Sequence, residues 1–355
     1  MNLLDMLGLA HPIIQAPMAG VSTPEMAAVV SNAGALGSIA VGAIDASAAR
    51  AMIDAVRERT DRPFNVNLFV HAPARSQPEV EQRWIDTLAP LFADYGAQPP
   101  SSLRAVYRSF AQDDAMLDML VNARPAVVSL HFGLPDRRKI ERLKAAGCVL
   151  LASATNLDEA LAAKAAGIDA VVAQGFEAGG HRGMFDLDGL DDQLGTMALT
   201  PLLVQHAGLP VIAAGGIMDG RAIQAALDLG AIAAQLGTAF IACPESSADP
   251  AYRAALFSPA AAHTVMTRVV SGRPARCLAN RFTAWGQHSD RQPPDYPIAY
   301  DAGKALNQAA KTAGEGGYGA QWAGQGAQLA RAMPAVELVA LLVAEMRDAR
   351  HLGLR

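Results

Sequence analysis

Short apolar runs alternate along the chain with stretches in which apolar residues recur at helical spacing. A short, continuous apolar run is typical of a strand that is buried on both faces of a parallel sheet. The predicted strands are Pro12–Met18, Leu36–Gly42, Phe64–Val70, Ala126–Gly133, Cys148–Ala154, Ala170–Ala173, Pro210–Gly215 and Ala231–Leu236.

Capping residues mark the helices between these runs. Thr23 before Pro24 predicts one helix start and Asp45 another, because an N-cap oxygen accepts from the free N–H groups of the first turn. Gly147 and Gly167 end two further helices. Eight β-then-α units within about 240 residues predict an α/β fold with a parallel sheet, closed as a (β/α)8 TIM barrel rather than left open.

The strands are evenly spaced except for one long connection after the third strand. Residues 71–125 are expected to form an insertion there, and a barrel over residues 1–260 is followed by a tail over residues 261–355. Because no flexible linker precedes the tail, it is predicted to be a helical cap over the barrel mouth. Its last helix is expected at Ala335–Arg350.

Polar and glycine-rich segments follow the predicted strands at the end where barrel enzymes place their sites. The strongest is Gln174–His181 (QGFEAGGH), where an amide, three glycines, an acid and an imidazole follow a buried strand. Glycine lets the backbone approach a ligand closely, while Gln and His supply donors and acceptors. The alternative interpretation is a tight turn with a surface histidine. Asn67 and His131 lie near the ends of two other strands.

Composition and charge exclude several classes of function. The chain is 51% hydrophobic and 18% charged, with a net charge of −5 and no run of Lys or Arg, which argues against nucleic acid or a membrane surface as partner. Its three scattered cysteines favour a reducing compartment and lack zinc-site spacing. Since neither a signal peptide nor a membrane span is apparent, we expect a cytoplasmic protein.

The residue types at the strand ends exclude further classes of enzyme. They carry no lysine, which disfavours a Schiff-base aldolase, and no Asp, Glu and His trio, so no metal site is predicted. Walls rich in amides suit a large neutral ring that brings its own reactivity, as a flavin does. Gly215, Gly216, Gly237 and Thr238 follow the last two strands, where their N–H groups can face one phosphate. Ordinary turn chemistry is the alternative.

Six motifs together resemble the class I nitronate monooxygenases, the FMN-dependent family once called 2-nitropropane dioxygenases. They are QAPMAG (15–20), AQGFEAGGH (173–181), AAGGIMDG (213–220), QLGTAF (235–240), SGRPAR (271–276) and QWAGQ (321–325). The resemblance implies a TIM barrel with one non-covalent FMN. It also implies oxidation of alkyl nitronates, such as propionate 3-nitronate, by O2 to a carbonyl compound and nitrite, and thus nitroalkane detoxification.

The resemblance also assigns roles to residues. His131 matches the catalytic histidine of the family. The substrate pocket would be lined by His181, Tyr107, Tyr300 and Lys304. The cofactor would be bound by Ala16, Pro17, Met18, Asn67, Gln174, Gly179, Gly180, Gly215, Gly216, Gln235, Gly237 and Thr238.

Three other functions stay open at this point. The nearest is an NAD(P)H-dependent flavin reductase of the same superfamily that acts on quinones or enoyl-ACP. A non-catalytic flavin-binding barrel and a flavin-free sugar-phosphate isomerase are the others. The assembly is also open, with a homodimer as one alternative.

Overall fold

The computed structural model describes residues 3–287 and 292–352, and in them eight parallel strands form one sheet. The strand order is β1-β9-β8-β6-β5-β4-β3-β2, and a parallel bridge between Ile14 and Leu36 joins the two outer strands, so the sheet closes as a barrel. The predicted TIM barrel is therefore confirmed. The strands are β1 (Ile13–Gln15), β2 (Gly37–Ala40), β3 (Phe64–Phe69), β4 (Val127–His131), β5 (Val149–Ala154), β6 (Ala170–Gln174), β8 (Val211–Ala214) and β9 (Ala233–Leu236).

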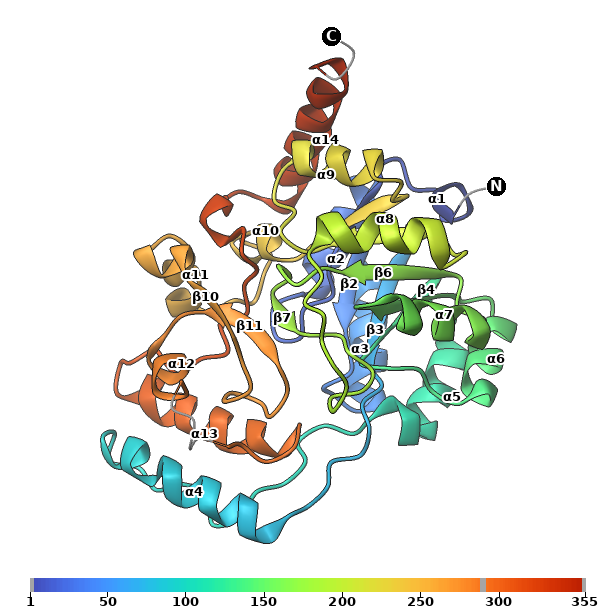
Figure 1. The fold of residues 1–355 in the computed structure, drawn as a ribbon. Helices are drawn as coiled ribbons and strands as arrows, with labels where there is room; N and C mark the ends of the chain where they lie inside the picture. The colour runs from blue at the N-terminus through green and yellow to red at the C-terminus, as the bar shows by residue number, and fades with distance from the viewer. Residues whose placement is uncertain (1–2, 288–291, 353–355) are drawn as a thin grey trace.

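Helices follow most of the strands and cover the outside of the barrel (Figure 1). Thr23 and Asp45 cap two of them as predicted, since their side chains accept from the N–H groups of Met26 and Ala48. Gly167 ends another in the left-handed conformation, with φ at 89°. The helices of this layer are α2 (Pro24–Asn32), α3 (Ala46–Arg57), α5 (Asp114–Ala123), α6 (Arg137–Ala145), α7 (Leu157–Ala166), α8 (Thr196–His206), α9 (Gly220–Asp228) and α10 (Thr238–Ile241).

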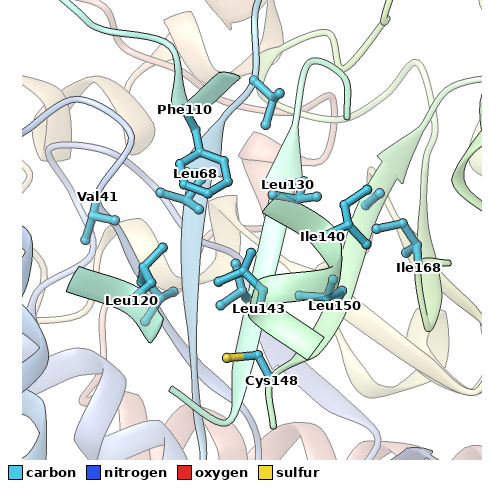
Figure 2. Packing of buried hydrophobic residues seen from close by; sticks show 14 of the residues in the cluster. Val41, Leu68, Phe110, Leu120, Leu130, Ile140, Leu143, Cys148, Leu150 and Ile168 are labelled. Atoms are coloured by element: carbon cyan, nitrogen blue, oxygen red, sulfur yellow. The ribbon is translucent and has the colours of Figure 1, made fainter. Parts of the chain in front are cut away.

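The core lies between the sheet and these helices. Figure 2 shows Leu130 of β4 and Leu150 of β5 in one buried cluster with Ile140 and Leu143 of α6. Each fully buried side chain of this size contributes roughly 1.5–3 kcal/mol to stability. Because the strands are buried on both faces, most of their side chains are apolar and pack the wall. A few polar groups such as Asn65 are buried inside the sheet, and others lie at the carboxyl ends of the strands.

The insertion and the tail lie together beside the barrel (Figure 1). Helix α4 (Pro78–Ala93) of the insertion packs against α13 (Ile298–Thr312) of the tail. The tail also contains a feature absent from the sequence prediction, an antiparallel sheet in which β10 (Thr264–Thr267) and β11 (Ala275–Leu278) join β7 (Gly180–His181) from the barrel loop. The final helix, α14 (Ala335–Leu352), packs on α9 and α2.

The remaining helices are short. They are α1 (Leu3–Met6), α11 (Pro250–Leu256) and α12 (Arg281–Trp285), with 3₁₀ turns at Phe110–Gln112, Pro259–Ala262 and Ala327–Leu329. No helix in the described ranges is both long and apolar enough to cross a membrane. The boundary between barrel and tail at residue 260 stays a prediction.

Candidate active site

A cavity of about 470 Å³ lies at the carboxyl ends of the barrel strands. This volume is within the range of about 300–1,000 Å³ that is usual for ligand and cofactor sites. Loops of the barrel form one wall, and the insertion and tail contribute Tyr107, Tyr296, Tyr300 and Lys304 to the other. Among the described residues, no Asp or Glu lines it. The cavity therefore offers neutral polar groups and cations, which suits an anionic ligand.

One end of the cavity, which we call the glycine end, is built from backbone. It consists of Gly179, Gly215, Gly216, Gly237, Thr238 and Gly324. At Gly179 an added Cβ would lie 2.5 Å from the backbone nitrogen of Gly324, so two chain segments meet there with no room for a side chain. The Gly324 N–H donates to Thr238 Oγ1 at 2.9 Å, which leaves the Thr238 hydroxyl proton for another acceptor.

A network of hydrogen bonds behind the glycine end fixes its shape. The Glu177 carboxylate accepts from the backbone N–H of Thr196 at 2.8 Å. The Thr196 hydroxyl in turn donates to the carbonyl of Gly215 at 2.9 Å. Gly216 adopts φ of +71°, in the left-handed region that L side chains rarely occupy. The local geometry thus holds backbone groups in place around a small volume.

The other end, which we call the imidazole end, is built from side chains. His131 Nδ1 lies 2.8 Å from Ser153 Oγ, and His131 Nε2 lies 3.2 Å from the carbonyl oxygen of His181. A carbonyl only accepts, so Nε2 carries the proton and Nδ1 accepts from the Ser153 hydroxyl. The same carbonyl accepts from Gln174 Nε2 at 3.0 Å. Both nitrogens of His131 are therefore engaged within the chain.

Burial keeps both imidazoles neutral. It lowers the pKa of His131 to about 4, assisted by the positive charge of Arg273 and opposed by the bond to His181. The pKa of His181 is also lowered, well below its usual value, first by burial and then by Arg273 and His131. His181 Nε2 is 2.9 Å from the hydroxyl of Ser271.

Aromatic rings surround the one ammonium group among the described lining residues. Lys304 Nζ lies 4.6 Å from the ring centre of Tyr107 and 5.1 Å from that of Tyr300. These cation–π contacts hold a charge that lacks a carboxylate partner within 4 Å in the described structure. Burial raises the pKa of Tyr300 to about 12, so its hydroxyl is a proton donor at neutral pH. The hydroxyl of Tyr296 is buried with no partner, which leaves it to a ligand.

Comparison with known proteins places this geometry in a family. The profile of the family described as "Nitronate monooxygenase" matches residues 1–345. A nitronate monooxygenase of Paraburkholderia phytofirmans is 60% identical over 98% of this chain and 95% of its own length. The chain belongs to the nitronate monooxygenase family. Enzymes of this family are flavin-dependent oxidoreductases.

Solved structures are similar over nearly the whole fold. A nitroalkane oxidase from Streptomyces ansochromogenes has a TM-score of 0.89 and 41% identity, covering 98% of this chain and 99% of that one. FabK from Thermotoga maritima has a TM-score of 0.75 and 28% identity, covering 99% and 97%. The shared architecture thus includes the tail as well as the barrel.

Every residue that the family resemblance assigned to the site lines this one cavity. The cavity is also lined by residues that sequence reasoning missed. Most of them come from the barrel and its loops, Phe69 and Tyr252 among them, and the tail adds Tyr296, Trp322, Gly324 and Gly326. Trp322 and Gly324 lie in the QWAGQ motif, which was the available signal for them. Gln174 lines the cavity and also holds the β6–β7 loop, since its Oε1 accepts from the N–H of Gly183 at 2.7 Å.

Proposed function

We propose that this protein uses FMN and O2 to oxidise alkyl nitronates, propionate 3-nitronate among them, to a carbonyl compound and nitrite. The observation that carries the proposal is the distribution of charge in the cavity. No carboxylate among the described residues lines it, while Lys304 supplies an ammonium group without a carboxylate partner. A nitronate and a phosphate are both anions, and such walls favour both.

The residues present fit FMN. Gly216, Gly237 and Thr238 would bind the phosphate with backbone N–H groups and the Thr238 hydroxyl, whose oxygen already accepts from Gly324. Ala16, Pro17 and Met18 would flank the ring, and Asn67 and Gln235 would offer it amide groups. Bound FMN would supply the electron acceptor for the nitronate and the centre that reacts with O2.

The imidazole end favours an already ionised substrate over a neutral nitroalkane. Removing a proton from a nitroalkane requires a base with a free lone pair and a pKa near the working pH. The unprotonated Nδ1 of His131 is occupied by Ser153, and its pKa is about 4. A nitronate needs no such base. We infer that His131 holds the carbonyl of His181 in place, and that His181, Lys304 and Tyr300 orient the anion.

Anaerobic mixing tests this function against its main rival. A nitronate should bleach the flavin quickly and NADH should not, and air should then restore the yellow colour with release of nitrite. The similarity to FabK keeps a reductase as the second candidate. Fast bleaching by NADH together with inertness toward nitronates would establish the reductase and reject the monooxygenase.

The cysteines bear on the cellular compartment of the enzyme. The free, buried cysteines Cys148, Cys243 and Cys277 support a reducing compartment such as the cytoplasm. The homodimer stays a prediction, to be checked by measuring the mass in solution.

A further inference from the structure

Two neighbouring arginines behind the imidazole end are buried, but only one has a carboxylate partner. Arg182 is 2% exposed and binds Asp191 through two nitrogens, at 3.0 and 2.9 Å. Arg273 is also 2% exposed, and its guanidinium donates only to the backbone carbonyls of Arg182 and Met184. Within the described part of the chain, no carboxylate lies within 4 Å of it. A buried charge of this kind is costly, so its retention points to a use.

A single aromatic ring separates this charge from the histidines. The guanidinium of Arg273 lies 4.0 Å from the ring centre of Phe132. The centre of the Phe132 ring also lies 4.4 Å from the ring centre of His131 and 5.6 Å from that of His181. The SGRPAR segment thus reaches both imidazoles, because Ser271 of the same segment also bonds His181.

The backbone at Phe132 is strained in a way that supports this arrangement. Phe132 adopts φ of +80°, which a bulky residue other than glycine rarely does. Such a conformation is unfavourable by itself and persists where the surrounding structure requires it. Here it lets the ring lie between Arg273 and His131.

The charged and titratable groups around the arginine leave its charge uncancelled. Glu159 is an acidic group whose negative charge acts on Arg273. Its carboxylate already accepts hydrogen bonds from Thr155 and from the N–H of Phe185. Tyr296 and Arg268 are the other groups that act on it. Burial lowers the pKa of Arg273 to about 10, so the guanidinium still carries its charge at neutral pH.

We propose that Arg273 is an electrostatic positioning residue, whose uncancelled charge acts across the ring of Phe132, adds to burial in disfavouring protonation of His131 and His181, and biases the cavity toward anions. His71, behind Tyr296, is the other imidazole that this charge reaches. The inference rests on the proposed function only for the identity of the anion. The effect of Arg273 on the two histidines can be measured whether or not the protein oxidises a nitronate.

Titration of the histidine ring protons by NMR in the full-length holoprotein tests the proposal. Arg273→Gln keeps a donor for the carbonyls but removes the charge, and Arg273→Lys restores a cation. With Gln, the pKa of His131 should rise by about one pH unit, the shift expected for one charge across a ring at an intermediate dielectric. With Lys it should stay near the wild-type value. Arg276→Met is the matched control, because Arg276 is buried but stacks on Phe176 instead.

Binding of nitrite, measured by calorimetry, gives a second readout. Arg273→Gln should weaken it about tenfold, and Arg273→Lys should recover most of the loss. An unchanged pKa of His131 in Arg273→Gln, or a wild-type His131 that titrates near 6.5, would overturn the proposal, and the second result needs no variant. Failure to oxidise nitronates would reject the proposed function but leave the titration result standing.

Discussion

The two ends of the cavity are built by different means. The glycine end is backbone: Gly179 and Gly324 meet without side chains, and Thr196 and Glu177 hold the loop from behind. The imidazole end is built from side chains. The rings of His131 and Phe132 are in contact, as are those of His181 and Tyr296, and the guanidinium of Arg273 lies over the ring of Phe132. Backbone groups cannot titrate, so the first end is insensitive to pH but intolerant of added volume. The second end tolerates small changes of shape but depends on charge.

The strongest way to separate the two ends is to remove an imidazole. His131→Asn should lower kcat/KM for a nitronate by about 10²-fold, the loss that a misplacement of about 1 Å near the reacting groups can cause. The dissociation constant for FMN, measured by quenching of flavin fluorescence, should change less than about threefold, because His131 lies away from the glycine end.

His206→Asn is the matched control for that variant. His206 is exposed at the end of α8 and should behave as wild type. Equal losses of FMN affinity and activity in His131→Asn would show that the two ends are not separate.

The converse variant adds volume at the glycine end. Gly179→Ala places a Cβ 2.5 Å from the nitrogen of Gly324, and backbone cannot yield as a flexible side chain can. We expect FMN to bind at least about tenfold more weakly, while saturating FMN restores most of kcat. Gly189→Ala is the control, since the nearest atoms to its added Cβ are 3.5 Å away. Unaltered FMN binding in Gly179→Ala would contradict the geometry.

The contrast also explains how far the sequence could predict the site. The barrel could be predicted because each strand and cap is a local signal, such as Asp45 before α3 or Gly167 after α7. The glycines at the strand ends are local signals of the same kind. Strands β7, β10 and β11 were not predicted, because none of them is a continuous apolar run of the kind that marks a buried parallel strand. They also pair over long separations, as in the ladder between Gly180 and Arg276.

Side chains brought to the cavity by the insertion, by α11 and by the tail could not be located by pattern. Tyr107, Tyr300 and Lys304 were assigned through the family resemblance alone, and no periodicity distinguishes them from other residues of their helices and loops. Tyr296 and Tyr252 line the same cavity without any local signal. A charge acting through a ring, as at Arg273 and Phe132, is visible only once the chain is folded.

The pH dependence of stability should include a contribution from the imidazole end. His131 has a folded pKa of about 4, below the unfolded value of 6.5, so between these values only the unfolded state binds the proton. Stability is therefore fully present above pH 6.5 and falls as the pH drops toward 4, by about 1.4 kcal/mol per pH unit for each such histidine. Urea unfolding at pH 7 and pH 5 measures this. The slope should be smaller in His131→Asn, and an identical slope would place its pKa near 6.5.

The smallest expected effect tests whether the ammonium group between the tyrosines recognises the substrate. Lys304→Met should raise KM for propionate 3-nitronate about five- to tenfold, and raise it less for ethyl nitronate, which lacks the second negative charge. The matched control is Lys311→Met, about two helical turns further along α13, whose amine is paired with Asp249 at 2.5 Å. Lys304 has no carboxylate within 4 Å among the residues that the structure describes and is held by two rings, so its charge is available to a ligand. If KM for the two nitronates rises equally, Lys304 recognises the nitronate group that both share. If neither KM changes, the charge of Lys304 serves the packing of Tyr107 and Tyr300, and substrate recognition at the imidazole end depends on the histidines.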